Sequence, residues 1–281
     1  MWPLRRPAFT ARTSYDTCVD STQDKERRKK LQKAAGSVEQ AGRRFRKAVA
    51  KGTLHKLREE AFQLPGITGT EAYTWAYENG MVGRKNGRRL YDQLMAVPEH
   101  DTCPLCGQGM VRTLDHFLPK ADFAALCVDP LNLIPACADC NKAKGDKAPQ
   151  TPEKVTLHPY LDNIDDCPWL TARVVRESPT WLEYFITPPG HWDELLTHRT
   201  GHHFEVFNLA ELYSAQAGRT LNSIRQQLDD LLGAAGFQSV RDYLEGEART
   251  RRAARLNGWE TAAYQAWAKD DWFCAGGWTD I

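Results

Sequence analysis

The chain has 281 residues, enough for one large domain or two small domains with a hydrophobic core. Hydrophobic residues make up 42% and charged residues 26% of it, and no apolar run is long enough to span a bilayer, which excludes an integral membrane protein. The first residues, Met-Trp-Pro-Leu-Arg-Arg, lack the apolar core of a secretory signal. We therefore expect a cytoplasmic protein with no membrane partner.

The formal charge of +1 hides an uneven distribution. Residues 1–150 carry 25 Lys and Arg against 17 Asp and Glu, whereas residues 151–281 carry 12 against 19. A basic half beside an acidic half fits nucleic-acid contact by the first half, and either protein contact or plain solubility for the second.

The first predicted element is a strongly basic helical stretch over residues 20–60. Its apolar residues recur at helical spacing, with Gly36 and Gly42 as weak points. One group of its cations contains Arg43, Arg44 and Lys47. Two interpretations stay open, a solvated amphipathic helix and an arm that contacts phosphates.

Shorter elements follow along the chain. We expect a helix at 71–79 that Thr70 would cap, and another at 88–97 that stops before Pro98. The polar segment 142–152 is the best candidate boundary. Beyond it the pattern predicts strands at 169–175 and 181–186, helices at 208–218, 221–232 and from about Trp259, and an apolar tail at 272–278 that docks on the body.

The eight cysteines include two Cys-x-x-Cys pairs, Cys103 with Cys106 and Cys137 with Cys140. In a cytoplasmic chain, paired cysteines at this spacing indicate a metal site more than disulfides. Four thiolates match a closed, tetrahedral, structural zinc site. The alternative, four reduced cysteines buried as small hydrophobic residues, fits poorly with their polar neighbours.

Residues with catalytic chemistry lie between and just after these pairs. Asp115 and His116 follow a β-prone run at 111–114, and Asn141 directly follows the last cysteine, where a helix over 140–145 should open. Zinc would tie the start of that helix to the first cysteine pair. Asp115 and Asn141 could then converge on one divalent cation.

Residues 98–147 resemble the HNH endonuclease family, in the four-cysteine, treble-clef form of its endonuclease VII-like members. The resemblance rests on the two cysteine pairs, an Asp-His-x-x-Pro element, a central Asn-Leu and a Cys-Asn-x-x-Lys-Gly ending, all in order. It implies a small ββα-metal module. The third signature position is Asn141 here, where many relatives have His and endonuclease VII-like members also have Asn.

By that resemblance His116 is the general base that activates water. Asp115 and Asn141 would hold a catalytic Mg²⁺ or Mn²⁺, and Asn132 would brace the loop that orients His116. A base of near-neutral pKa and a cation that offsets phosphate charge are what phosphodiester hydrolysis needs. Three flanking lysines are candidate phosphate contacts, although each singly is an ordinary surface residue: Lys120, Lys142 and Lys144.

We predict an α+β, mostly helical protein with three regions: a basic helical region (1–97), the zinc-containing HNH module (98–150) and a mostly helical C-terminal region (151–281). The expected function is metal-dependent hydrolysis of DNA in bacterial or phage restriction, defence or processing, where DNA is preferred over RNA by the resemblance alone. A regulatory protein partner such as an ATPase is plausible. The rival interpretations are an inactive zinc-ribbon DNA-binding module and a protein-interaction subunit.

Three nearby histidines, His198, His202 and His203, suggest a second metal site. No carboxylate or thiol completes a recognisable ligand spacing around them, so we do not predict one.

Overall fold

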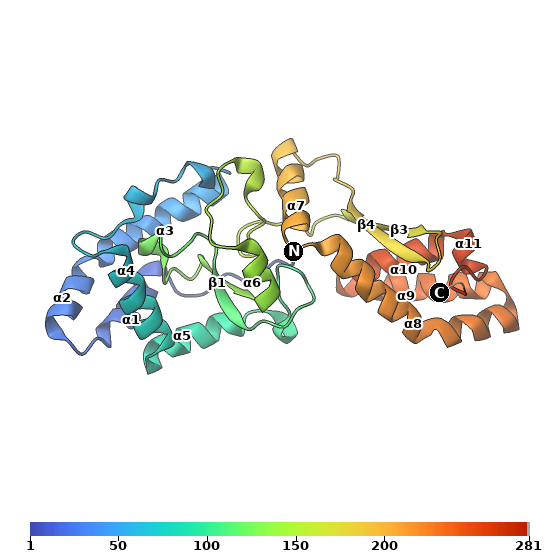
Figure 1. Cartoon of the computed structure of the whole chain (residues 1–281), viewed down its shortest axis with the longest axis horizontal. Helices are drawn as coiled ribbons and strands as arrows, with labels where there is room; N and C mark the ends of the chain where they lie inside the picture. Colours follow the sequence, from blue (N-terminus) through green and yellow to red (C-terminus); the bar gives the residue numbers. More distant parts are fainter. Residues whose placement is uncertain (280–281) are drawn as a thin grey trace. The chain divides into compact units, whose positions relative to one another are not determined.

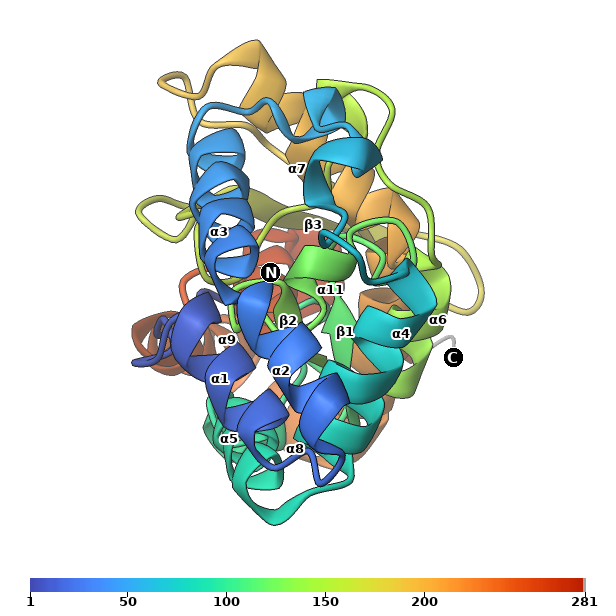
Figure 2. The same cartoon turned by 90° about the vertical axis from the view of Figure 1, so that its left-hand side faces the viewer.

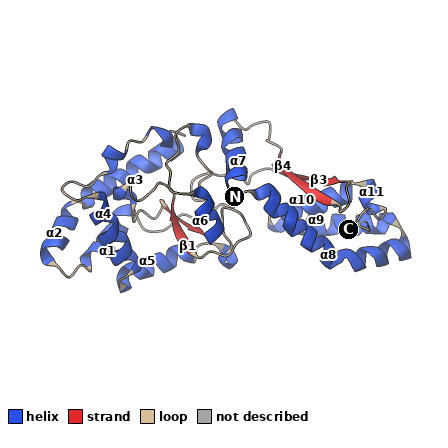
Figure 3. Ribbon diagram, in the orientation of Figure 1, coloured by secondary structure: helices blue, strands red, loops and turns tan. Residues whose placement is uncertain are grey.

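A computed structural model describes residues 1–279 and shows a mostly helical chain whose strands form two small antiparallel sheets (Figure 3). This confirms the predicted α+β, mostly helical class. None of the helices in the described part of the chain is long and apolar enough to cross a membrane. The chain divides into two compact units, Met1–Asn163 and Ile164–Ile281, and each is described by itself (Figure 1).

The first unit wraps helices around one two-stranded sheet. Its elements are α1 (Ala11–Asp20), α2 (Lys25–Lys33), α3 (Ala35–Ala50), α4 (Gly69–Ala72), the π-helix η3 (Tyr73–Val82), α5 (Lys85–Met95), β1 (Thr113–His116), β2 (Leu133–Ala136) and α6 (Ala138–Lys144), joined by loops and short 3₁₀ turns. Figure 2 shows this unit with α1, α2, α3 and α4 toward the viewer and β1 and β2 behind them.

The core of the first unit joins its helical part to the cysteine-containing part. Helix α3 buries Val38, Ala41 and Phe45 and packs on the 3₁₀ turn Ala124–Leu126, while α5 packs against both strands. Residues 1–97 and 98–150 therefore share one hydrophobic core. The predicted division into three regions, 1–97, 98–150 and 151–281, stays a prediction.

Two predicted helix boundaries in this unit are wrong. The basic stretch forms two helices that meet at Ala34 and end at Ala50, and Gly42 lies buried inside α3. A Cβ at Gly42 would lie 2.5 Å from the Asp129 carboxylate, so this glycine allows a close approach and is not a break. Thr68, not Thr70, caps α4, because its side chain and that of Glu71 form a reciprocal capping box.

The second unit packs a β-hairpin on a group of helices. Its elements are β3 (Leu170–Val175), β4 (Trp181–Ile186), α7 (Glu194–Val206), α8 (Leu209–Ala235), α9 (Phe237–Ala254), α10 (Trp259–Lys269) and α11 (Asp271–Cys274). Both predicted strands are present. The helices predicted at 208–218 and 221–232 are one helix, α8. The apolar tail is docked as predicted, since Phe273, Cys274 and Trp278 are fully buried.

Candidate metal centre and active site

A short ββα unit positions the candidate site. Strands β1 and β2 pair antiparallel so that Asp115 lies opposite Ile134 and His116 lies opposite Leu133. Helix α6 begins directly after β2, with Cys137 as its N-cap and Gly145, at φ +67°, as its C-cap. Asp115 and His116 thus belong to the strand, which lies two residues later than the predicted run at 111–114. Because β1 ends at His116, both side chains reach the same cleft.

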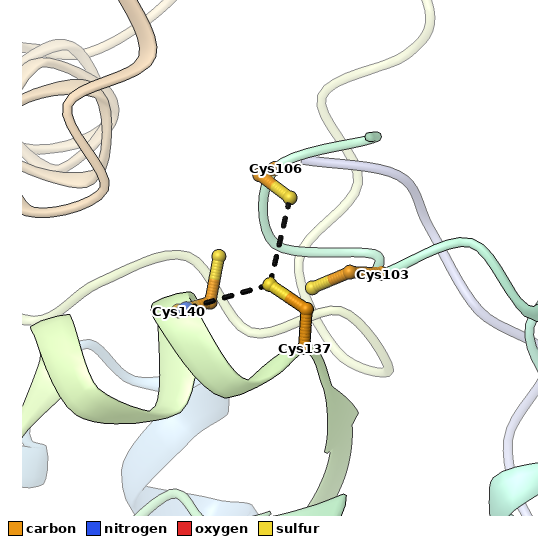
Figure 4. Close-up of side chains that lie close together, drawn as sticks. All are labelled: Cys103, Cys106, Cys137 and Cys140. Carbon is orange, nitrogen blue, oxygen red and sulfur yellow. Dashed lines mark hydrogen bonds between the residues drawn. The ribbon is translucent and has the colours of Figure 1, made fainter. Parts of the chain in front are cut away.

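The four predicted zinc ligands lie together at the start of this unit (Figure 4). Their sulfur atoms all lie within 4.8 Å of one another, and every one of the four side chains is buried. Cys106 Sγ and Cys137 Sγ are 4.0 Å apart. In a tetrahedral zinc site with Zn–S bonds of about 2.3 Å, neighbouring sulfurs are about 3.8 Å apart, so the spacing fits zinc. None of the four cysteines forms a disulfide.

The backbone around the cluster prepares it for anionic sulfur. Gly109 donates its N–H to Cys106 Sγ at 3.3 Å, and Cys140 donates its N–H to Cys137 Sγ at 3.4 Å. Only glycine fits at 109, where a Cβ would come within 2.7 Å of Cys137. This donor set fits a thiolate-bound cation.

A cleft of about 540 Å³ opens beside the cluster. It brings together three of the residues to which the sequence assigns catalysis or catalytic metal binding, namely Asp115, His116 and Asn141. The other lining residues are Tyr77, Leu114, Pro119, Lys120, Ala121, Asp122, Lys142, Gly145 and Asp146. Two carbonyl-type oxygen donors and an imidazole therefore meet in one solvent-open cavity.

The hydrogen bond of His116 fixes which ring nitrogen can act as a base. His116 Nε2 lies 2.9 Å from the carbonyl oxygen of Cys127. A carbonyl only accepts, so Nε2 carries the proton and, in the neutral ring, Nδ1 keeps its lone pair. Burial lowers the pKa of His116 to about 4, which keeps the ring neutral at pH 7. The ring of Tyr77 packs edge-on against it, with centroids 4.6 Å apart.

Asp115 is a buried carboxylate with one cationic neighbour. Its side chain is 6% exposed, and its Oδ2 and Oδ1 lie 3.1 and 3.3 Å from the Lys144 ammonium. Burial raises the pKa of Asp115 to about 6, while Lys144 acts in the opposite direction. The group is therefore ionised at neutral pH and carries the negative charge that a hard cation requires.

Asn132 is fully buried behind the cleft and does not line it. Its side chain accepts the N–H of Leu118 at 2.8 Å and donates to the carbonyls of Leu118 and Leu126 at 3.0 and 3.3 Å. It thus ties the segment that follows His116 to the loop that presents the Cys127 carbonyl.

The predicted phosphate-contacting lysines differ in position. Lys120 and Lys142 line the cleft, where Lys120 also pairs with Glu78 at 2.8 Å. Lys144 does not line the cleft, because its ammonium is directed at Asp115. Their contact with phosphate stays a prediction.

The basic residues of α3 lie outside this cleft. Arg43, Arg44 and Lys47 are exposed on the face opposite the buried one. Arg43 pairs with Glu39 at 3.2 Å, and Arg44 donates to the Ala61 carbonyl at 3.1 Å. Their role also stays a prediction.

Sequence reasoning missed two contributors to the surroundings of His116. Tyr77 lies in a π-helix, for which the sequence carries no periodic signal, although π-helical turns are frequent at functional sites. The Cys127 carbonyl is backbone and leaves no residue-type signal.

Of the described residues, one further group has metal-ligand chemistry, the partly exposed Asp166, Cys167 and His191 of the second unit. It contains none of the three histidines considered from the sequence.

Comparison with known proteins adds two findings. A family model described as HNH endonuclease matches residues 103–147, the segment that holds both cysteine pairs and the cleft residues Asp115, His116 and Asn141. Protein ea31 of Escherichia phage lambda is 30% identical over 215 residues, which cover 71% of this chain and 72% of that protein. No solved structure matches the chain significantly.

Proposed function

Since the chain belongs to the HNH endonuclease family, we propose that it is a metal-dependent endonuclease that hydrolyses DNA phosphodiester bonds. The observation that carries the proposal is the pairing of His116, whose Nδ1 keeps its lone pair, with Asp115 and Asn141 in one cleft. DNA rather than RNA is the proposed substrate because of the family alone.

Each residue of the cleft has a distinct part in this proposal. Asp115 and Asn141 would hold Mg²⁺ or Mn²⁺, which supplies positive charge to offset the negative charge that develops on the phosphate. His116 Nδ1 accepts a proton from water as the water oxygen attacks phosphorus and the bond from phosphorus to the leaving oxygen breaks. The Cys127 carbonyl stabilises the imidazolium that forms, because it accepts a hydrogen bond from Nε2–H in both charge states of the ring.

A structural zinc at Cys103, Cys106, Cys137 and Cys140 would fix Asn141 relative to Asp115. Cys140 directly precedes Asn141 in α6, while Cys103 and Cys106 precede the strand that carries Asp115. Anchoring both segments at one ion would help to set their separation, together with the two-stranded sheet and the contact of Lys144 with Asp115.

The wider role is also a proposal. Lys120 and Lys142 would bind phosphates beside the cut, and Arg43, Arg44 and Lys47 would add affinity that does not depend on sequence. The proposed setting is restriction, defence or processing of phage or bacterial DNA in the cytoplasm, and the phage origin of the similar protein ea31 is compatible with phage biology. A regulatory protein partner, for instance an ATPase, would restrain the nuclease.

The test is cutting of supercoiled plasmid by the full chain with Mg²⁺, with Mn²⁺ and with a chelator of both. Wild type should cut only with a cation. Asp115→Ala and Asn141→Ala should cut poorly, with partial rescue at high Mn²⁺, because they lose cation occupancy. Asp230→Ala, an exposed substitution in α8, is the matched control. Undiminished cutting in the chelator, or by both cleft variants, would refute the proposed site.

A further inference from the structure

Lys144 is an unusual surface lysine because its charged end is directed inward. It is the last residue of α6, and its side chain is 10% exposed. Its ammonium donates to Asp115 Oδ1 at 3.3 Å, to the carbonyl of His116 at 2.9 Å and to that of Gly145 at 3.3 Å. An ammonium has three N–H groups, so all three are directed at oxygens of this site.

Two features hold this positive charge in place. The two backbone carbonyls belong to the end of β1 and the end of α6, so they stay where they are whatever happens at Asp115. The ion pair is also buried on both sides, and charges there interact through a lower effective dielectric than charges in water. Lys144 therefore acts on Asp115 at close range and with little screening.

Asp115 is the acidic residue of the proposed cation site, and its carboxylate already forms an ion pair with the Lys144 ammonium. The proposed ligand Asn141 and the proposed base His116 are neutral at pH 7. The other acidic residues that line the cleft are Asp122 and Asp146, while Asp115 is the one whose carboxylate the Lys144 ammonium contacts. A divalent cation on the Asp115 oxygens would thus repel an ammonium that lies 3.1 Å from one of them.

We propose that Lys144 is a positioning residue that limits the affinity of the site for its catalytic cation, by sharing the carboxylate of Asp115 with it. The same ammonium contacts both Asp115 and the His116 carbonyl and fixes their relative positions. It therefore sets the geometry of the site while it weakens cation binding. The proposal rests on the proposed function, in which Asp115 is a cation ligand.

The experiment measures Mn²⁺ binding to the zinc-loaded full chain without DNA, from the electron paramagnetic resonance signal of free Mn²⁺. It is done at pH 8. Lys144→Gln should bind Mn²⁺ about ten- to a hundredfold more tightly than wild type, since a unit charge a few ångströms away is removed. Lys144→Arg, which keeps the charge, should stay near wild type.

The controls separate the ion pair from general charge. Lys147→Gln removes the same charge from an exposed residue three positions farther along the chain, outside the cleft lining, and should change Mn²⁺ affinity by less than about threefold. Asp115→Asn should abolish the binding. Zinc content and circular dichroism verify each fold, and if Lys144→Gln does not fold, Lys144→Met takes its place in the comparison.

Two results contradict different claims. Unchanged or weaker Mn²⁺ binding by folded Lys144→Gln, together with Mn²⁺-dependent cutting by wild type, overturns the proposal for Lys144 alone. If no variant shows saturable Mn²⁺ binding and wild type does not cut DNA, the proposed function itself is contradicted.

Discussion

Replacement of Asn132 by Ala should loosen the loop that holds His116. The buried side chain makes three hydrogen bonds, one with the N–H of Leu118 and two with the carbonyls of Leu118 and Leu126. At about 1 kcal/mol net for each bond, their loss lowers the free energy of unfolding of the first unit by about 3 kcal/mol. The unpaired backbone groups left behind add to this cost.

The effect on cleavage should exceed that of lost stability. Without Asn132, the loop at 126–132 is free to withdraw the Cys127 carbonyl from His116 Nε2, so the ring loses the partner that fixes its tautomer. Cleavage should fall by about tenfold or more even where the protein is fully folded.

Hydrogen–deuterium exchange read by mass spectrometry localises the change. Peptides that cover residues 117–132 should exchange faster in Asn132→Ala, while those of the second unit should not change. Asn222→Ala, an exposed substitution in α8, is the matched control. Wild-type exchange at 117–132 together with wild-type cleavage would refute the bracing role.

Three further predictions address zinc, a buried charge and the basic helix. Cys137→Ser should lose the zinc, measured by elemental analysis, and destabilise residues 98–150, because the zinc ligands join the loop before β1 to the start of α6. Asp129 is fully buried with a pKa raised by burial to about 6, above the usual 3.8 of an Asp. The folded state thus binds this proton more tightly than the unfolded state, so unfolding free energy falls as pH rises from about 4 to 6. Asp129→Asn should remove that decline and stabilise the first unit at pH 7 by up to about 3 kcal/mol in denaturant titrations, an effect that vanishes below pH 4. Replacement of Arg43, Arg44 and Lys47 by Gln should weaken DNA binding and flatten its dependence on salt, whereas an unchanged slope would show that this helix face is only solvated.

The metal centre could be predicted from sequence because its ligands are recognisable from residue type and spacing alone. Two Cys-x-x-Cys pairs leave few structures open, and Asp115, His116 and Asn141 follow them in a recognisable order. The fold class followed from helical periodicity for the same reason. Strand 181–186 was found because four of its six residues are β-branched or aromatic and it lies between turn residues.

The rest depends on tertiary contacts that no local pattern reveals. Gly42 resembled a helix break, but its lack of a side chain serves the approach of Asp129, which is remote in sequence. Lys144 resembled a surface cation, because nothing in its neighbours indicates that Asp115 lies 3.1 Å away. The partner that fixes the His116 tautomer is a backbone carbonyl, which every residue has.

The most direct test of the account is the single-turnover cleavage rate of His116→Ala at saturating Mg²⁺ or Mn²⁺. We expect a rate about 10² to 10⁴ times lower than wild type, with zinc content, folding and DNA affinity retained, because only the base is removed. His198→Ala, an exposed substitution in α7, should cut at the wild-type rate. A folded, zinc-loaded His116→Ala protein that cuts as fast as wild type would contradict the assignment of this cleft as the active site.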